Sequence, residues 1–80
     1  MKRKFVVTVK AVWDDEADVW VATSEDVPGL ILEAPDTDQL EKEIKLHIPQ
    51  LLTLNDGDHK PREIPIRLYQ ESEFMATAIA

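Results

Sequence analysis

The chain has 80 residues, so it can form one small domain, and such a domain buries a smaller share of its surface than a larger one does. It contains no cysteine, which excludes disulfides as a source of stability and favours a reducing compartment, the cytoplasm. A formal net charge of −7 argues against broad binding to nucleic-acid phosphates and favours a basic partner.

The first predicted element is a strand over residues 4–13, where β-branched and aromatic residues dominate. Thr8 and Lys10 prefer water, so the opposite face of this strand is expected to be covered; it consists of Phe5, Val7, Val9 and Ala11. The basic start followed by apolar residues resembles a signal peptide, but Lys10 interrupts the apolar stretch. No run approaches the ~20 apolar residues of a membrane span, so no membrane segment is predicted.

Two further strands are predicted over residues 19–24 and 30–34. The acidic segment before them, residues 14–18, contains no glycine and therefore predicts a hairpin loop of more than two residues, built on a type I turn. Pro28 and Gly29 break the chain between the second and third strands.

One amphipathic helix is predicted over residues 36–55, because apolar residues recur on one face at Leu40, Ile44, Ile48, Leu51 and Leu52. Asp36 is the expected N-cap, and Gln39, three residues later, can complete a capping box. Asn55 and Gly57 tolerate the left-handed turn that ends helices.

Two prolines interrupt the regular patterns of the second half of the chain. Pro49 lies inside the helix and predicts a kink or a break near Lys45. Pro65 lies inside a predicted fourth strand, residues 62–69, and cannot donate a hydrogen bond to a neighbouring strand, so this strand is expected at a sheet edge. Residues 70–80 show no clear period and are predicted to be a C-terminal tail.

These elements predict an α+β domain with the order β-β-β-α-β. The first three strands form an antiparallel meander, and the helical connection implies a parallel fourth strand at the edge, with the helix packed on one face of the sheet. Residues 1–80 are treated as a single domain. Cores of this size are often completed by a second chain, so a homodimer is expected.

The polar residues give little support for an enzyme. Asp14, Asp15, Glu16 and Asp18 follow one another in one turn, whereas catalytic carboxylates usually converge from separate elements, so a solvated turn is the preferred interpretation. Residues 55–59 lack the ligand spacing and final glutamate of a calcium loop. His47 lies beside the apolar stripe and is interpreted as a hydrogen-bonded boundary residue. We predict no catalytic residue, no metal ligand and no cofactor.

Trp13 and Trp20 flank the acidic turn, and strand pairing can bring them together across the hairpin. Cross-strand packing is the first interpretation of this pair, and a partner-binding platform is the second. The candidate partner-binding residues are Trp13, Asp14, Asp15, Glu16 and Trp20.

Three short motifs resemble the HicB antitoxin superfamily. They are the aromatic-rich second strand at Trp20-Val21-Ala22, the D-x-P-G turn at Asp26-Val27-Pro28-Gly29, and the helix entry at Ala34-Pro35-Asp36-Thr37. The closer resemblance is to a family of short uncharacterised bacterial proteins within that superfamily, which share the I-P-x-L-L segment found at residues 48–52. The resemblance covers residues 4–69.

The resemblance implies a partial ribonuclease-H-like fold without the catalytic carboxylates of that enzyme. In HicB proteins this domain binds a small basic toxin that cleaves messenger RNA, and it covers the active surface of the toxin. Too few residues follow the fourth strand for the DNA-binding module of full-length HicB proteins, so DNA binding is not expected.

The function expected from these observations is a non-catalytic, antitoxin-like protein-binding domain. One alternative is a small domain that binds a small ligand or another protein, which an apolar pocket lined by both tryptophans would favour. The other is a metal-dependent nuclease that uses Asp14 and Asp15.

Overall fold

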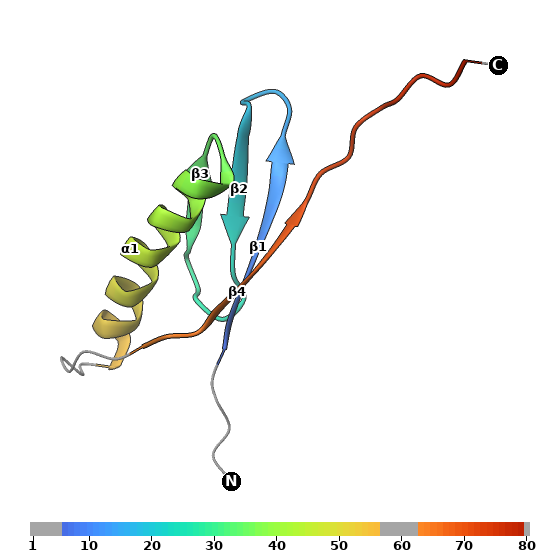
Figure 1. Cartoon of the computed structure of the whole chain (residues 1–80). Coiled ribbons are helices and arrows are strands. Elements are labelled where there is room, and N and C mark those ends of the chain that lie inside the picture. The colour runs from blue at the N-terminus through green and yellow to red at the C-terminus, as the bar shows by residue number, and fades with distance from the viewer. Residues whose placement is uncertain (1–5, 57–62, 80) are drawn as a thin grey trace, which may run out of the picture.

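The computed structural model describes residues 6–56 and 63–79, which form four strands and one helix (Figure 1). The strands are β1 (Val7–Asp14), β2 (Val19–Thr23), β3 (Ile31–Ala34) and β4 (Ile66–Glu71), and the helix α1 (Thr37–Asp56) connects β3 to β4. The α+β class and the predicted order of elements are confirmed. Lys4 and Phe5 of the predicted first strand lie outside the described residues.

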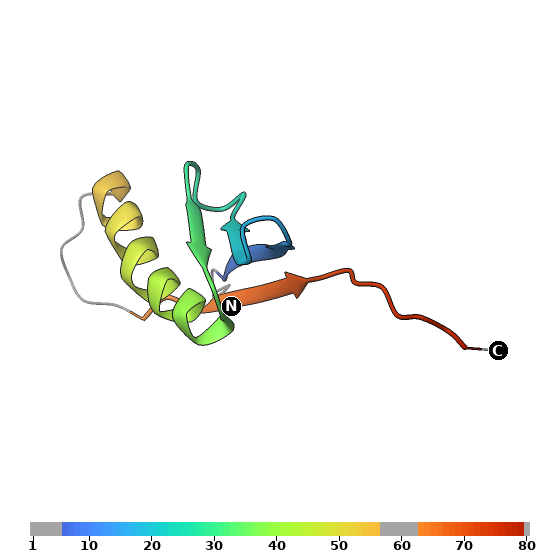
Figure 2. The same ribbon diagram turned by 90° about the horizontal axis from the view of Figure 1, so that it is seen from above.

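The four strands form one mixed sheet in the order β3-β2-β1-β4. The β1–β2 and β2–β3 pairs are antiparallel, and β4 pairs with β1 in parallel. The predicted meander and the predicted parallel fourth strand at the edge are therefore confirmed. Seen from above, α1 lies on one face of the sheet (Figure 2).

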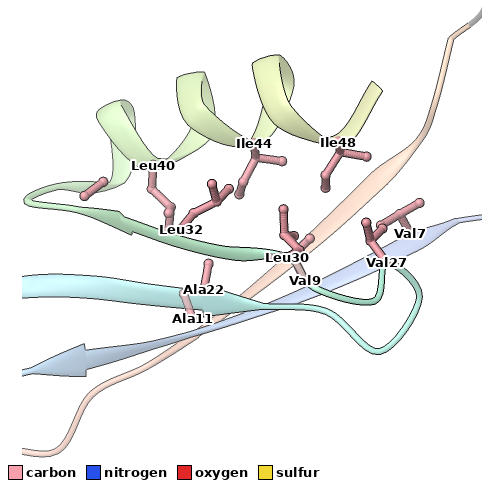
Figure 3. Close-up of a cluster of buried hydrophobic side chains, with 11 residues drawn as sticks. Val7, Val9, Ala11, Ala22, Val27, Leu30, Leu32, Leu40, Ile44 and Ile48 are labelled. Atoms are coloured by element: carbon pink, nitrogen blue, oxygen red, sulfur yellow. The ribbon is translucent and has the colours of Figure 1, made fainter. Parts of the chain in front are cut away.

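The hydrophobic core lies between this face and α1, because alternate strand residues point to the same side. In β1 the three described members of the predicted inward set, Val7, Val9 and Ala11, are at most 1% exposed. Leu40, Ile44 and Ile48 of α1 point toward the strands (Figure 3) and complete the cluster, while Leu51 and Leu52 are half-buried beside it. No polar side chain is buried in the described part of the chain.

Helix α1 has the N-cap that its sequence predicts, whereas the side chain of Gln39, expected to complete a capping box, donates to Glu43. The Oδ1 atom of Asp36 accepts a hydrogen bond from the backbone N–H of Gln39 at 2.8 Å, and the carbonyl oxygen of Asp36 accepts one from Leu40 at 3.0 Å. Asp36 is therefore the N-cap. Of the two outcomes predicted near Lys45, a kink or a break, the break does not occur, because the helix continues through Pro49 to Asp56. Packing of the stripe on the sheet outweighs the lost backbone hydrogen bond. The predicted loop beyond Asp56, including Gly57, lies outside the described residues.

The connection between β2 and β3 shows what the D-x-P-G motif does. The backbone N–H of Leu30 donates to the carbonyl of Val27 at 3.1 Å, which closes a four-residue turn with proline second and glycine third. Gly29 has a φ of 85°, so the turn has the features of type II. The carboxylate of Asp26 accepts the backbone N–H of Thr8 at 2.8 Å. The motif thus ties the turn to β1 and buries Val27.

The fourth strand differs from its predicted bounds of residues 62–69. It starts at Ile66 and ends at Glu71, so the predicted tail loses its first two residues to the sheet, and Arg62 lies outside the described residues. The cause is the ladder with β1, which pairs Val7 with Ile66 and Val12 with Glu71. Pro65 precedes the strand, and its carbonyl oxygen accepts the N–H of Val7 at 2.9 Å.

Candidate functional site

The acidic hairpin loop is organised by the first of its carboxylates. The Oδ1 atom of Asp14 accepts the backbone N–H groups of Glu16 at 3.0 Å and Ala17 at 3.3 Å. The N–H of Asp18 donates to the carbonyl of Asp14 at 2.8 Å, and Asp18 has a φ of 56°, a conformation that aspartate tolerates better than most residues. Asp14 is thus a turn-forming residue. The predicted loop of more than two residues is confirmed, since Asp14 pairs with Val19.

The two tryptophans meet across the hairpin, as predicted. Trp13 pairs directly with Trp20, and their ring centroids are 5.4 Å apart with an interplanar angle of 67°, an edge-to-face contact. Both side chains are half-buried, and Trp20 also packs against the edge of the core. Cross-strand packing holds the pair in place and leaves part of each ring accessible.

A shallow hollow of about 430 Å³ lies beside this pair. Its lining comes from the hairpin, the entry to α1 and the segment after β4, and consists of Trp13, Asp15, Trp20, Pro35, Asp36, Thr37, Ser72, Glu73 and Phe74. A hydrogen bond from Nε2 of Gln70 to Oγ1 of Thr37, 3.0 Å long, ties the end of β4 to the start of the helix. Segments far apart in the sequence are therefore assembled at one end of the sheet.

The charge of this hollow favours a cation. Its lining includes three carboxylates, Asp15, Asp36 and Glu73, and no lysine or arginine. The start of α1 also lies here, and a helix N-terminus attracts anions through its free N–H groups. One of those N–H groups, that of Gln39, already donates to Asp36. Three negative charges exceed the roughly half charge of the helix dipole, so a basic group suits the hollow better than a phosphate.

The five candidate partner-binding residues line two hollows that share part of their lining. Trp13, Asp15 and Trp20 line the hollow described above. Asp14 and Glu16 line a second open hollow of about 460 Å³, with Val12, Val21, Trp13 and Asp15. Trp13 and Asp15 belong to both.

Sequence reasoning missed the part of the hollow that comes from the C-terminal segment. Ser72, Glu73 and Phe74 follow β4 directly, and the end of β4 was placed too early. Phe74 could have indicated this contribution, since it is one of only two phenylalanines in the chain and follows a run of four polar residues. Its neighbours in space depend on the β1–β4 register, which no local pattern encodes.

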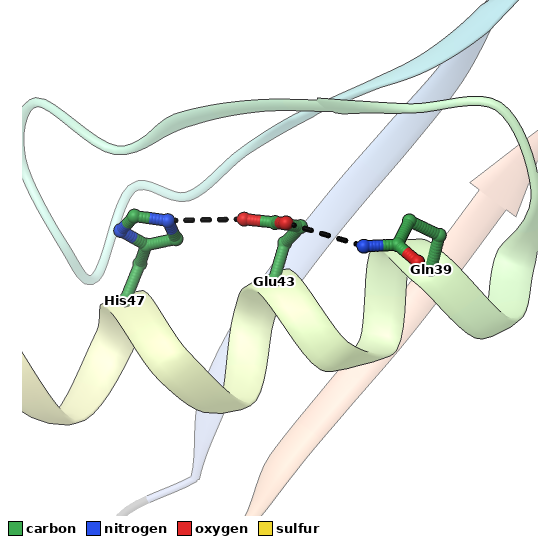
Figure 4. Close-up of polar contacts among 3 residues, drawn as sticks. All are labelled: Gln39, Glu43 and His47. Carbon is green, nitrogen blue, oxygen red and sulfur yellow. Dashed lines mark hydrogen bonds and ion pairs between the residues drawn. The ribbon is translucent and has the colours of Figure 1, made fainter.

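The other polar candidate, His47, has a structural role. Its Nε2 atom lies 3.0 Å from Oε2 of Glu43, and the other oxygen of Glu43 accepts a 3.3 Å hydrogen bond from Gln39, so the three side chains form a row along α1 (Figure 4). This agrees with the predicted hydrogen-bonded boundary residue.

Within residues 6–56 and 63–79, no group of three histidine, cysteine, aspartate or glutamate residues is arranged to hold a metal ion. No helix in that part of the chain is long and apolar enough to cross a membrane.

Comparisons with known proteins place the chain among its relatives. The chain is similar to the hypothetical protein TTHA1013 from the extremely thermophilic bacterium Thermus thermophilus, whose crystal structure is known. The two share 35% sequence identity, the match covers 92% of this chain and 100% of that one, and the TM-score is 0.63. No curated protein matches the chain. The model of a domain of unknown function, DUF1902, matches residues 6–78, and the chain therefore belongs to the DUF1902 family.

Proposed function

We propose that this protein is a non-catalytic protein-binding domain that uses the tryptophan end of its sheet to bind a basic protein. The observation that carries the proposal is the hollow in which two tryptophans are surrounded by three carboxylates without a basic residue. An arginine or lysine side chain placed over a tryptophan face gains about 0.5–1 kcal/mol at an exposed site and about 2 kcal/mol when water is excluded. The carboxylates add charge complementarity, which speeds association and selects the partner.

The basic partner that we propose is a small toxin that cleaves messenger RNA, with this protein acting in the cytoplasm as its antitoxin. Support comes from the motifs that resemble HicB antitoxins and from the net charge of −7. The test is co-expression with the product of the adjacent gene, followed by co-purification and an RNA-cleavage assay. A small basic protein that co-purifies and loses its cleavage activity would support the proposal. An adjacent gene that encodes no such protein, or a product that does not bind, would contradict it.

The tryptophans provide a direct reporter of binding at this site. The chain has two tryptophans, and both line the hollow, so all its tryptophan fluorescence originates there. Titration with the purified partner is expected to change the emission. Asp15→Lys with Glu73→Lys should weaken binding about tenfold or more, because both reverse the charge of the rim. Glu25→Lys with Glu33→Lys is the matched control, since it makes the same total charge change on two exposed residues that do not line the hollow.

A second function is favoured by the shape of the same hollow, whose volume falls within the range of small-molecule sites. A small organic cation would satisfy the same aromatic and acidic groups. Titration with arginine amide and choline separates the two functions. Saturable binding of either at micromolar concentration would favour a ligand-binding domain, whereas binding only to the basic protein would favour the first function.

A further inference from the structure

The segment after β4, residues 72–79, carries large apolar side chains that are left exposed by residues 6–56 and 63–79. Both views show this segment, which we call the arm, running away from the sheet as a continuation of β4 (Figures 1 and 2). Phe74, Met75 and Ile79 are 83%, 92% and 93% exposed. Three apolar side chains on one short extended segment are costly to leave in water, and such a segment is typical of one that binds elsewhere.

The domain also has an apolar surface that remains open. Ile66 and Leu68 of β4 point toward the helix side of the sheet but are only half-buried, and a hollow of about 210 Å³ separates them from Glu41, Ile44 and Lys45 of α1. β4 is the last strand of the sheet, so its outer edge has no neighbour within the described chain. An open strand edge beside an apolar hollow is suited to accept one more extended segment.

We propose that two copies of this chain exchange their arms, each arm adding as an antiparallel strand to the outer edge of β4 in the other copy. The arm and the acceptor edge are parts of one continuous extended segment, so a twofold axis satisfies both copies at once. The arm shares Glu73 and Phe74 with the hollow assigned to the basic partner, but its test, the oligomeric state of the chain alone, does not depend on that function.

The side chains select one register for this pairing. In β4 the even-numbered residues face the helix side, as the half-buried Ile66, Leu68 and Gln70 show. If alternation continues, Phe74 lies on that same side. With Gln70 on the twofold axis, Phe74 lies opposite Ile66 of the partner subunit and fills the apolar hollow. The same register places Arg67 opposite Glu73 of the partner subunit, a favourable cross-strand pair of opposite charge.

The first test is the oligomeric state of the full 80-residue chain, measured by light scattering over a dilution series. We expect a particle of twice the 9.1 kDa mass of one chain. Phe74→Glu with Met75→Glu should raise the dissociation constant at least about a hundredfold, since Phe74 is the anchor residue of this interface and such residues dominate its affinity. Both side chains are almost fully exposed in the single chain, so its fold should be unchanged, as circular dichroism would verify. Leu46→Glu, which also replaces an exposed apolar residue, should leave the dimer intact.

The second test uses the absence of natural cysteine. Gln70→Cys should form a disulfide-linked dimer on mild oxidation, because the two residues 70 face each other across the axis. Arg67→Cys and Glu73→Cys should cross-link when the two variants are mixed and should not cross-link separately. A monomeric unmodified chain, a dimer that survives the double glutamate substitution, or a dimer without these cross-links would overturn the proposal.

Discussion

Two regions of the same sheet face differ in what covers them. Toward the end of α1, Ile48 lies over Val7 and Val27, and all three are completely buried (Figure 3). At the hairpin end, Trp13 and Trp20 continue the same face and are only half-buried. Strand alternation assigns a side chain to a face, but the position at which the helix starts decides whether that side chain enters the core. Apolar residues beyond the helix are therefore available for contacts with other molecules.

The largest effect is expected in the covered region. Ile48→Ala should lower the free energy of unfolding by about 2–5 kcal/mol, because it removes buried methylene groups and leaves a cavity. Chemical denaturation would measure the change. Leu46→Ala, on the solvent side of the same helix and 55% exposed, should change stability by less than about 0.5 kcal/mol. Equal losses from the two variants would show that the helix does not pack through the predicted stripe.

The turn that brings Val27 and Leu30 into the covered region is expected to have the next largest effect. Gly29→Ala should cost about 1–2 kcal/mol because the φ of 85° is unfavourable for a residue with a Cβ atom. A Cβ built at this position has no atom within 4 Å, so strain is the whole cause. Gly29→Asn should recover part of the loss, since asparagine tolerates this conformation better than alanine. A loss from asparagine as large as that from alanine would contradict backbone strain as the cause.

The uncovered region is expected to contribute less. A double-mutant cycle of Trp13→Leu and Trp20→Leu should give a coupling energy of about 0.5–1.5 kcal/mol for the edge-to-face contact. The cycle is read from denaturation curves of the four proteins. A coupling of several kcal/mol would mean that the tryptophans belong to the core, and it would remove the distinction between the two regions.

The smallest effect is expected from the row of polar side chains on α1. Glu43→Gln should change the free energy of unfolding by no more than about 0.5 kcal/mol, because His47 and Glu43 are partly exposed and neighbours on one helix. Thermal unfolding of the variant beside the unmodified protein would measure it. A loss above about 1 kcal/mol would indicate that this row contributes more to the stability of the fold than its exposure suggests.

The sequence predicts the features that depend on neighbouring residues. Asp36 caps the helix, Leu40, Ile44 and Ile48 face the core, and Pro28-Gly29 forms the turn, because each signal lies within a few positions of its effect. The bounds of β4 could not be predicted in this way, since they follow from its pairing with β1, which is distant in the sequence. The tryptophan contact was predicted from the hairpin alone. The contribution of Glu73 and Phe74 to the hollow could be predicted only with knowledge of how the whole sheet is arranged.

The parallel pairing of β1 with β4 has a consequence for biosynthesis. Among the strands described here, Val7 belongs to the first that the ribosome makes, and its partner Ile66 belongs to the last. The meander and the helix can assemble before β4 is made, and until then the edge of β1 that pairs with β4 is open. Contacts between such distant parts of a chain form slowly. We therefore expect docking of the final strand to limit the folding rate, and nascent chains to be prone to aggregation until that strand has been synthesised.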